Sequence, residues 1–75
     1  MKTINEALGD VISKSRAKIG LSQEKFAERV GIHRTYVSQL ERGLKSPTLD
    51  ILEKLSAGLD TRPSRLLRMA EDELE

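Results

Sequence analysis

The amino-acid sequence predicts an all-α fold, a compact bundle of five short helices. Apolar residues recur every three or four positions in successive windows, which is the spacing of amphipathic helices. Glycine or proline separates these windows at short intervals, and no window alternates apolar and polar residues as a half-buried strand does. Because 75 residues allow one domain, we expect residues 1–75 to form a single unit.

The first two helices are expected at residues 4–19 and 23–30. Gly20 is suited to end the first helix, and the Ser22 hydroxyl is suited to cap the start of the second. The inward stripe comprises Ile4, Leu8, Val11, Ile12, Ser15 and Ile19 in the first helix, and Phe26, Ala27 and Val30 in the second.

Three further helices are expected at residues 33–41, 49–59 and 63–74. The residues that delimit them are Gly43 after the third, Thr48 before the fourth, Gly58 and Asp60 at its end, and Pro63 in the first turn of the fifth. Their apolar residues are Leu49, Ile51, Leu52, Leu55 and Leu59 in the fourth helix, and Leu66, Leu67, Ala70 and Leu74 in the fifth.

Charge is unevenly distributed along the chain, although the formal net charge is only +1. Residues 14–47 carry a net charge of +5, whereas residues 69–75 carry −4. A positive central region indicates an anionic partner. An ordinary solvated surface is the alternative that charge alone leaves open.

Composition excludes several functional classes. The absence of Cys excludes a disulfide framework and a thiolate nucleophile. The longest apolar run is two residues, so we expect a cytoplasmic protein with no membrane partner. There is one His, no glycine-rich phosphate loop and no carboxylate pair in an expected cleft. We therefore expect neither an enzyme nor a catalytic residue, bound metal or cofactor.

Residues 23–42 carry the spacing of a helix-turn-helix. Ala27 is small where two short helices would approach, and Gly31, four residues later, tolerates the positive φ of a tight turn. Val37 and Leu40 would hold the second helix of the pair against the rest of the bundle. The alternative is an ordinary αα-hairpin with a glycine turn.

The helix expected at residues 33–41 has two distinct faces. His33, Tyr36, Val37 and Leu40 cluster on one side, and Glu41 lies toward the protein. The opposite side holds Arg34, Thr35, Ser38, Gln39 and Arg42, which all donate hydrogen bonds and include no acid. Such side chains can read base edges in a DNA major groove: Arg pairs with guanine and Gln with adenine. A solvated polar face is again the alternative.

The run from Leu21 to Leu55 resembles the Cro/C1-type (XRE) helix-turn-helix family of lambda-like phage repressors. The segment HRTYVSQLERG is particularly similar to the small controller proteins of restriction–modification systems. The resemblance implies a lambda-repressor-like domain that regulates transcription. It also implies binding to a palindromic double-stranded operator as a homodimer, with the third helix in the major groove. An activator of this kind would also contact RNA polymerase.

The resemblance assigns roles to individual residues. It implies base reading by Arg34, Thr35, Ser38 and Gln39, phosphate contacts by Gln23, Tyr36, Arg42, Lys45 and Ser46, and a structural ion pair between Arg16 and Glu41. The position of Tyr36 on the inward face stands against a DNA contact. The lone His33 is expected on the surface or near the DNA backbone.

Dimerisation is expected to involve the fourth helix, the loop into the fifth and the helix at residues 63–74, because the apolar residues of this region exceed the needs of one core face. The candidates are Leu59, Leu66, Leu67 and Met69. That these four side chains simply complete the core of the monomer is an equally supported interpretation.

Other functions remain open at the level of sequence. A prophage-type repressor and the antitoxin of a toxin–antitoxin pair share this kind of domain. An antitoxin needs a segment that holds the toxin, and the acidic end at residues 71–75 is very short for that purpose. A pure protein–protein adaptor ranks third, and loss of DNA binding on removal of Arg34 would exclude it.

Overall fold

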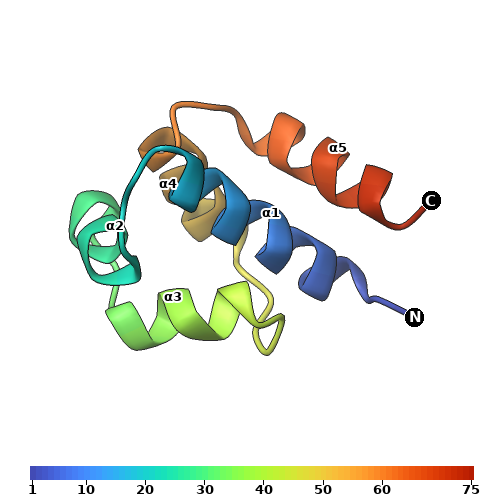
Figure 1. Cartoon of the computed structure of the whole chain (residues 1–75), viewed down its shortest axis with the longest axis horizontal. Coiled ribbons are helices and arrows are strands. Elements are labelled where there is room, and N and C mark those ends of the chain that lie inside the picture. The colour runs from blue at the N-terminus through green and yellow to red at the C-terminus, as the bar shows by residue number, and fades with distance from the viewer.

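The computed structural model describes all 75 residues and contains five α-helices and no strand (Figure 1). The helices are α1 (Ile4–Lys18), α2 (Gln23–Val30), α3 (Arg34–Glu41), α4 (Leu49–Gly58) and α5 (Pro63–Glu73). The prediction of an all-α bundle of five short helices is therefore confirmed, and no boundary differs from the expected one by more than one residue.

Hydroxyl side chains cap the start of three of the helices. The Thr3 hydroxyl accepts the Glu6 amide at 3.1 Å while the Glu6 carboxylate accepts the Thr3 amide, which forms a capping box at the start of α1. Ser22 caps α2 and Thr48 caps α4, as the sequence predicts. Each cap satisfies a backbone N–H that the first helical turn leaves without a partner.

Four expected helix boundaries are wrong by one residue, at the start of α3 and at the ends of α1, α4 and α5. His33 is the N-cap of α3 rather than its first residue, because its Nδ1 accepts the Thr35 amide at 3.1 Å. Gly58 does not break α4 but is its last residue. A Cβ at Gly58 would lie 2.2 Å from Cγ1 of Val30, so the glycine allows α4 to pack closely against α2.

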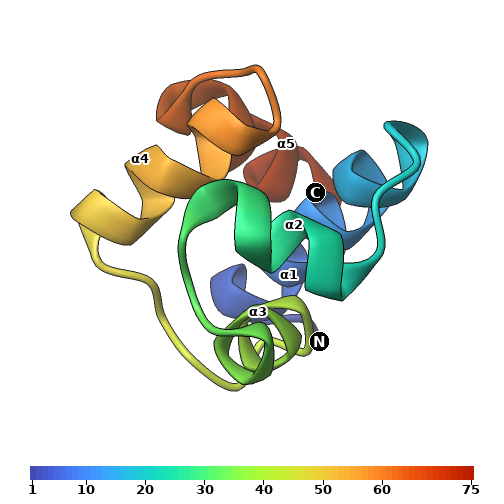
Figure 2. The ribbon, with the colours of Figure 1, turned by 90° about the vertical axis from the view of Figure 1, so that its left-hand side faces the viewer.

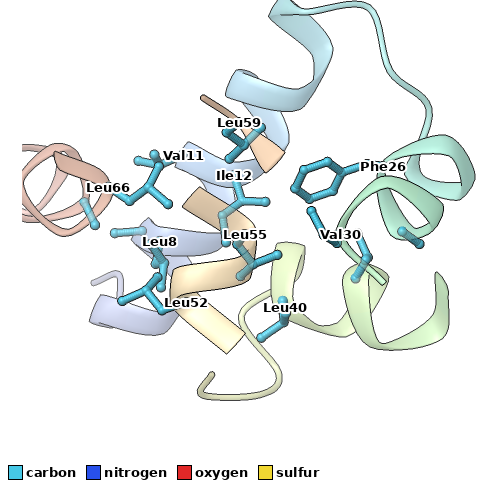
Figure 3. Packing of buried hydrophobic residues seen from close by; sticks show 14 residues of the cluster. Leu8, Val11, Ile12, Phe26, Val30, Leu40, Leu52, Leu55, Leu59 and Leu66 are labelled. Atoms are coloured by element: carbon cyan, nitrogen blue, oxygen red, sulfur yellow. The ribbon is translucent and has the colours of Figure 1, made fainter. Parts of the chain in front are cut away.

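The helices enclose one hydrophobic core, to which every helix contributes (Figure 3). The most completely buried large side chains include Phe26 of α2, Ile12 of α1, Leu55 of α4 and Leu66 of α5. The core comprises Ala7, Leu8, Val11, Ile12, Phe26, Ala27, Val30, Val37, Leu40, Leu52, Leu55, Leu59, Leu66 and Ala70.

Apolar residues at helix ends lie outside this core. Ile4 and Leu49 are the first residues of their helices and are 42% and 81% exposed. Ile19 and Leu74 follow the last helical residue of α1 and α5 and are 46% and 43% exposed. The helical stripe continues to these positions, but the neighbouring helices do not extend far enough to cover them.

The arrangement of the helices places the helix-turn-helix on one side of the molecule. Figures 1 and 2 show α1 in the middle, with α3 on one side and α5 on the other. Contacts agree with this view, since α1 packs against both α3 and α5, and α4 bridges α2 and α5. The outer face of α3 is therefore directed away from α5 and its acidic end.

None of the five helices combines the length and apolar character required to cross a bilayer. No three His, Asp or Glu side chains gather in a way that could hold a metal ion.

Candidate nucleic-acid interface

The turn between α2 and α3 sets the angle at which α3 is presented. Gly31 adopts the left-handed conformation (φ 73°, ψ 33°), which glycine reaches without the steric cost of a Cβ. The carbonyl of Ala27 accepts the amides of Gly31 at 2.9 Å and Ile32 at 3.1 Å. Ala27 is only 4% exposed, as expected for the small residue where two helices approach closely.

The inner face of α3 anchors the helix in the core. Val37 is fully buried and Leu40 is 2% exposed. Tyr36 is half-buried and packs against the core, on the inward side that its helical position predicts. Its role as a DNA contact stays a prediction.

The outer face of α3 holds the side chains expected to read bases. Arg34 and Thr35, in the first turn, are exposed, whereas Ser38 and Gln39 are half-buried. All four side chains come from one helix that is rigidly held from behind, so their spacing is fixed before any ligand arrives. The structure thus brings the four candidates together on one surface.

Basic and polar residues follow directly after α3. Arg42, the C-cap of α3, is exposed, and its Nε donates to the Ser38 carbonyl at 3.4 Å. Lys45 and Ser46 are exposed in the loop that leads to α4. These three residues extend the surface of α3 with donors suited to phosphate groups.

A buried ion pair fastens the end of α3 to α1. The Arg16 guanidinium donates to both carboxylate oxygens of Glu41, from Nε at 2.7 Å and from Nη2 at 3.0 Å. Its third nitrogen, Nη1, donates to the Leu21 carbonyl at 2.7 Å. The side chains are 15% and 5% exposed, and hydrogen bonding to Glu41 raises the pKa of Arg16 above its usual range. Arg16 is thus committed to a structural role.

Gln23 belongs to the same network. Its Nε2 donates to Oε1 of Glu41 at 2.9 Å, which links the start of α2 to the end of α3. Sequence reasoning gave Gln23 only a phosphate contact and missed this bond. Helical periodicity gives no sign of this bond, because it joins two different helices. The amide nitrogen carries a second hydrogen, so the bond to Glu41 does not exclude a phosphate contact.

A second ion pair joins α2 and α3 at the exposed surface. Nη1 of Arg34 lies 3.9 Å from Oε2 of Glu24, and the two side chains are 65% and 68% exposed. Sequence reasoning treated Arg34 as free and did not consider Glu24. On the same helix Glu28 pairs with Lys25 at 3.8 Å.

The expected dimer residues divide into two groups. Leu59 and Leu66 are 8% and 1% exposed and belong to the core of the monomer, so their assignment to a dimer surface was wrong. Leu67 and Met69 are 36% and 39% exposed. They flank the buried stripe of α5 on opposite sides, because residues of a helix are about 100° apart.

Comparisons with known proteins identify the family. A family model described as "Helix-turn-helix" matches residues 12–66. This chain belongs to the helix-turn-helix family. The predicted resemblance to Cro/C1-type regulators, and among them to controller proteins, is confirmed by the relatives described next.

Two curated relatives and one solved structure are especially similar to the chain. Control protein C.MunI of Mycoplasma sp is 40% identical over 74 residues, which span 97% of this chain and 100% of that protein. Control protein C.BamHI of Bacillus amyloliquefaciens is 45% identical over 51 residues, which span 68% of this chain and 63% of that protein. The restriction–modification controller protein C.Esp1396I, solved as a tetramer with its natural 35 base-pair operator, matches with a TM-score of 0.85 and 28% identity, covering 99% and 97% of the two chains.

Proposed function

We propose that this protein is a sequence-specific transcriptional regulator that binds double-stranded operator DNA, with α3 in the major groove. The observation that carries the proposal is the exposed face of α3, which presents Arg34, Thr35, Ser38 and Gln39 and includes no acidic side chain. The similarity of this chain to C.Esp1396I, a controller protein solved in complex with its operator, supports binding to DNA. The chain is a regulator and not an enzyme, in keeping with its relatives.

Two sets of residues have different roles in DNA recognition: one contacts phosphates and the other contacts bases. Arg42, Lys45 and Ser46 contact phosphates and fix the position of the domain on the duplex. Arg34 donates two hydrogen bonds to O6 and N7 of guanine, and Gln39 pairs with adenine. The bond from Gln23 to Glu41 orients its amide at the start of α2, where its second hydrogen serves a phosphate.

One domain contacts only a short stretch of DNA. A homodimer contacts two such half-sites, and the combined site is long enough to be specific. Two copies related by a two-fold axis place their α3 helices about 34 Å apart, in successive major grooves of a palindrome. Leu67 and Met69 remain candidates for the interface, and Leu44 and Leu49, 61% and 81% exposed, are the alternative apolar pair. Replacing each pair with Asp and measuring association by sedimentation equilibrium identifies which pair is covered in the dimer.

The regulated genes are those of a restriction–modification system. The similarity to the control proteins C.MunI and C.BamHI supports this assignment. A prophage-type repressor and an antitoxin are the alternatives, and an adjacent phage or toxin gene in place of a nuclease or methyltransferase gene would favour them. Because its proposed ligand is operator DNA, we place the protein in the cytoplasm, and an activating role would add RNA polymerase as a partner.

Selection of bound duplexes from a random pool tests the proposal. The protein should recover a palindrome with half-sites about one helical turn apart, bound by two chains. Binding that is sensitive to salt but enriches no sequence would overturn it. In that case the polar face of α3 does not read bases, and a protein partner becomes the better explanation.

A further inference from the structure

We propose that Glu24 is a specificity-determining residue: its carboxylate holds the Arg34 guanidinium and thereby withholds it from the phosphates of non-specific DNA. The inference rests on the proposed function, in which Arg34 reads a base. The side chains expected at the DNA from sequence are all hydrogen-bond donors, and the inference adds to them an acidic side chain that competes with DNA.

The first step is the isolation of this pair. Oε2 of Glu24 lies 3.9 Å from Nη1 of Arg34, and no other acidic side chain forms an ion pair with the exposed face of α3. Glu41, the one acid of α3 itself, is buried and bonded to Arg16. Glu24 is therefore the only carboxylate that competes with DNA for the recognition helix.

The second step is the location of Glu24. It is in the first turn of α2, directly after Gln23, whose amide is expected at the DNA backbone. Its side chain is 68% exposed, and its pairing with Arg34 places it on the surface that faces DNA in the proposed complex. A carboxylate in that place competes with the phosphates of any duplex for Arg34, whatever the DNA sequence.

The third step is the difference between the two ligands that DNA offers to Arg34. Guanine accepts two hydrogen bonds from one guanidinium through O6 and N7, in a geometry that matches the planar fork. A phosphate offers a negatively charged oxygen, as does the Glu24 carboxylate, whose Oε2 already lies 3.9 Å from Nη1. Leaving Glu24 for a phosphate therefore exchanges one charged oxygen partner for another, whereas leaving it for guanine adds two directed hydrogen bonds.

The pair can exchange partners because it is exposed. Both side chains are about two-thirds exposed, so water solvates each charge when they separate. An exposed pair of this length is weak, which lets the correct base displace it. A buried pair such as Arg16 and Glu41 could not serve in this way.

The test compares Glu24→Gln with Glu28→Gln. Both substitutions remove one exposed negative charge from α2, and each breaks one weak ion pair, at 3.9 Å and 3.8 Å respectively. Binding is measured at several salt concentrations to two duplexes: the operator recovered by selection and a scrambled duplex of equal length and composition. Circular dichroism and thermal unfolding verify that both variants fold.

Glu24→Gln should free Arg34 to contact one phosphate of the scrambled duplex. The logarithmic salt slope on that duplex should then become steeper by about 0.9, while the slope on the operator stays unchanged. Between about 50 and 200 mM salt this difference alone corresponds to roughly a threefold change in relative affinity. The preference of Glu24→Gln for the operator at low salt should fall. Glu28→Gln should change the affinity for both duplexes by the same factor.

A variant without Arg34 tests whether the release of Arg34 causes the steeper salt slope. In the Arg34→Ala background, Glu24→Gln should no longer change the salt slope on the scrambled duplex. Equal effects of Glu24→Gln and Glu28→Gln would overturn the inference, as would an effect that persists without Arg34. Selective loss of operator affinity in Glu24→Gln would also overturn it, because Glu24 would then support base reading directly.

The proposed function fails in a distinguishable way. If the unmodified protein shows no preference for any sequence, the function is wrong before a variant is made. If the preference exists and the two glutamate variants behave alike, only the role of Glu24 is wrong.

Discussion

The domain contains two guanidinium–carboxylate pairs that differ mainly in burial. Arg16 and Glu41 lie behind α3, form two short hydrogen bonds and are 15% and 5% exposed. Arg34 and Glu24 lie on the outer surface, approach to 3.9 Å and are 65% and 68% exposed. The same two functional groups therefore occur in one small domain under opposite conditions of solvation.

This difference shows how burial separates support from recognition. Water cannot replace Glu41, so the inner pair holds α1, α2 and α3 in one arrangement. Water or a ligand can replace Glu24, so the outer pair leaves Arg34 available to DNA. The comparison predicts that substitutions of the inner pair change folding and substitutions of the outer pair change binding.

The largest effect is expected from Glu41→Ala. The substitution leaves the Arg16 charge and the Gln23 amide without their buried acceptor, which should lower the free energy of unfolding by about 3–5 kcal/mol. Urea unfolding measures the change. Glu24→Ala is the matched control and should lower it by less than about 1 kcal/mol. Similar losses in the two variants would contradict the division between the pairs.

A second large effect is expected where α1 crosses α3. A Cβ at Gly9 would lie 2.5 Å from the carbonyl oxygens of Leu40 and Glu41, which are backbone atoms that cannot turn aside. Gly9→Ala should therefore destabilise the protein by about 1–3 kcal/mol. Helix propensity alone predicts the opposite sign, a gain of about 1 kcal/mol. An increase in the urea midpoint would show that α1 and α3 can separate enough at this position to accommodate a methyl group.

The third prediction concerns the outer surface. Arg34→Ala should weaken operator binding by about 1–3 kcal/mol and relax selectivity at one base pair, with unfolding almost unchanged. Arg42→Ala should weaken all duplexes alike and make the salt slope shallower by about one phosphate contact. Repeating the selection with each variant measures both effects. Equal loss of affinity without any change in preference would contradict the assignment of base reading to Arg34.

Much of this frame could be predicted from local sequence. Helix starts follow from single hydroxyl caps such as Ser22 and Thr48, and the turn follows from Gly31, because each depends on a few neighbouring residues. The two faces of α3 follow from helical periodicity alone. These features do not depend on how the rest of the chain packs.

The remaining features depend on how helices meet. Leu66 and Leu67 are adjacent and equally apolar, yet one is 1% and the other 36% exposed, because α1 and α4 decide which flank of α5 is covered. The pair of Glu24 and Arg34 spans two helices, and periodicity within one helix does not report distances between helices. Arg16 and Glu41 were expected only through the family resemblance.

The smallest effect is expected from an exposed cluster of charges at the N-terminus. Lys2 binds both Asp10 and Glu73 and so links the start of the chain to the end of α5. The hydrogen bond from Lys2 lowers the pKa of Asp10 below its usual range. A depressed pKa in the folded state contributes stability above the unfolded value of about 4, and this stability is lost as pH falls through the folded pKa.

Asp10→Asn should remove the pH-dependent stability that the Asp10 carboxylate contributes. The difference in urea midpoint between the unmodified protein and the variant should be constant near neutral pH and shrink below about pH 4. Glu75→Gln is the control, because Glu75 forms no ion pair and its variant should track the unmodified protein throughout. A difference for Asp10→Asn as large as that for Glu41→Ala would break the comparison, since an exposed pair would then stabilise the fold as strongly as a buried one.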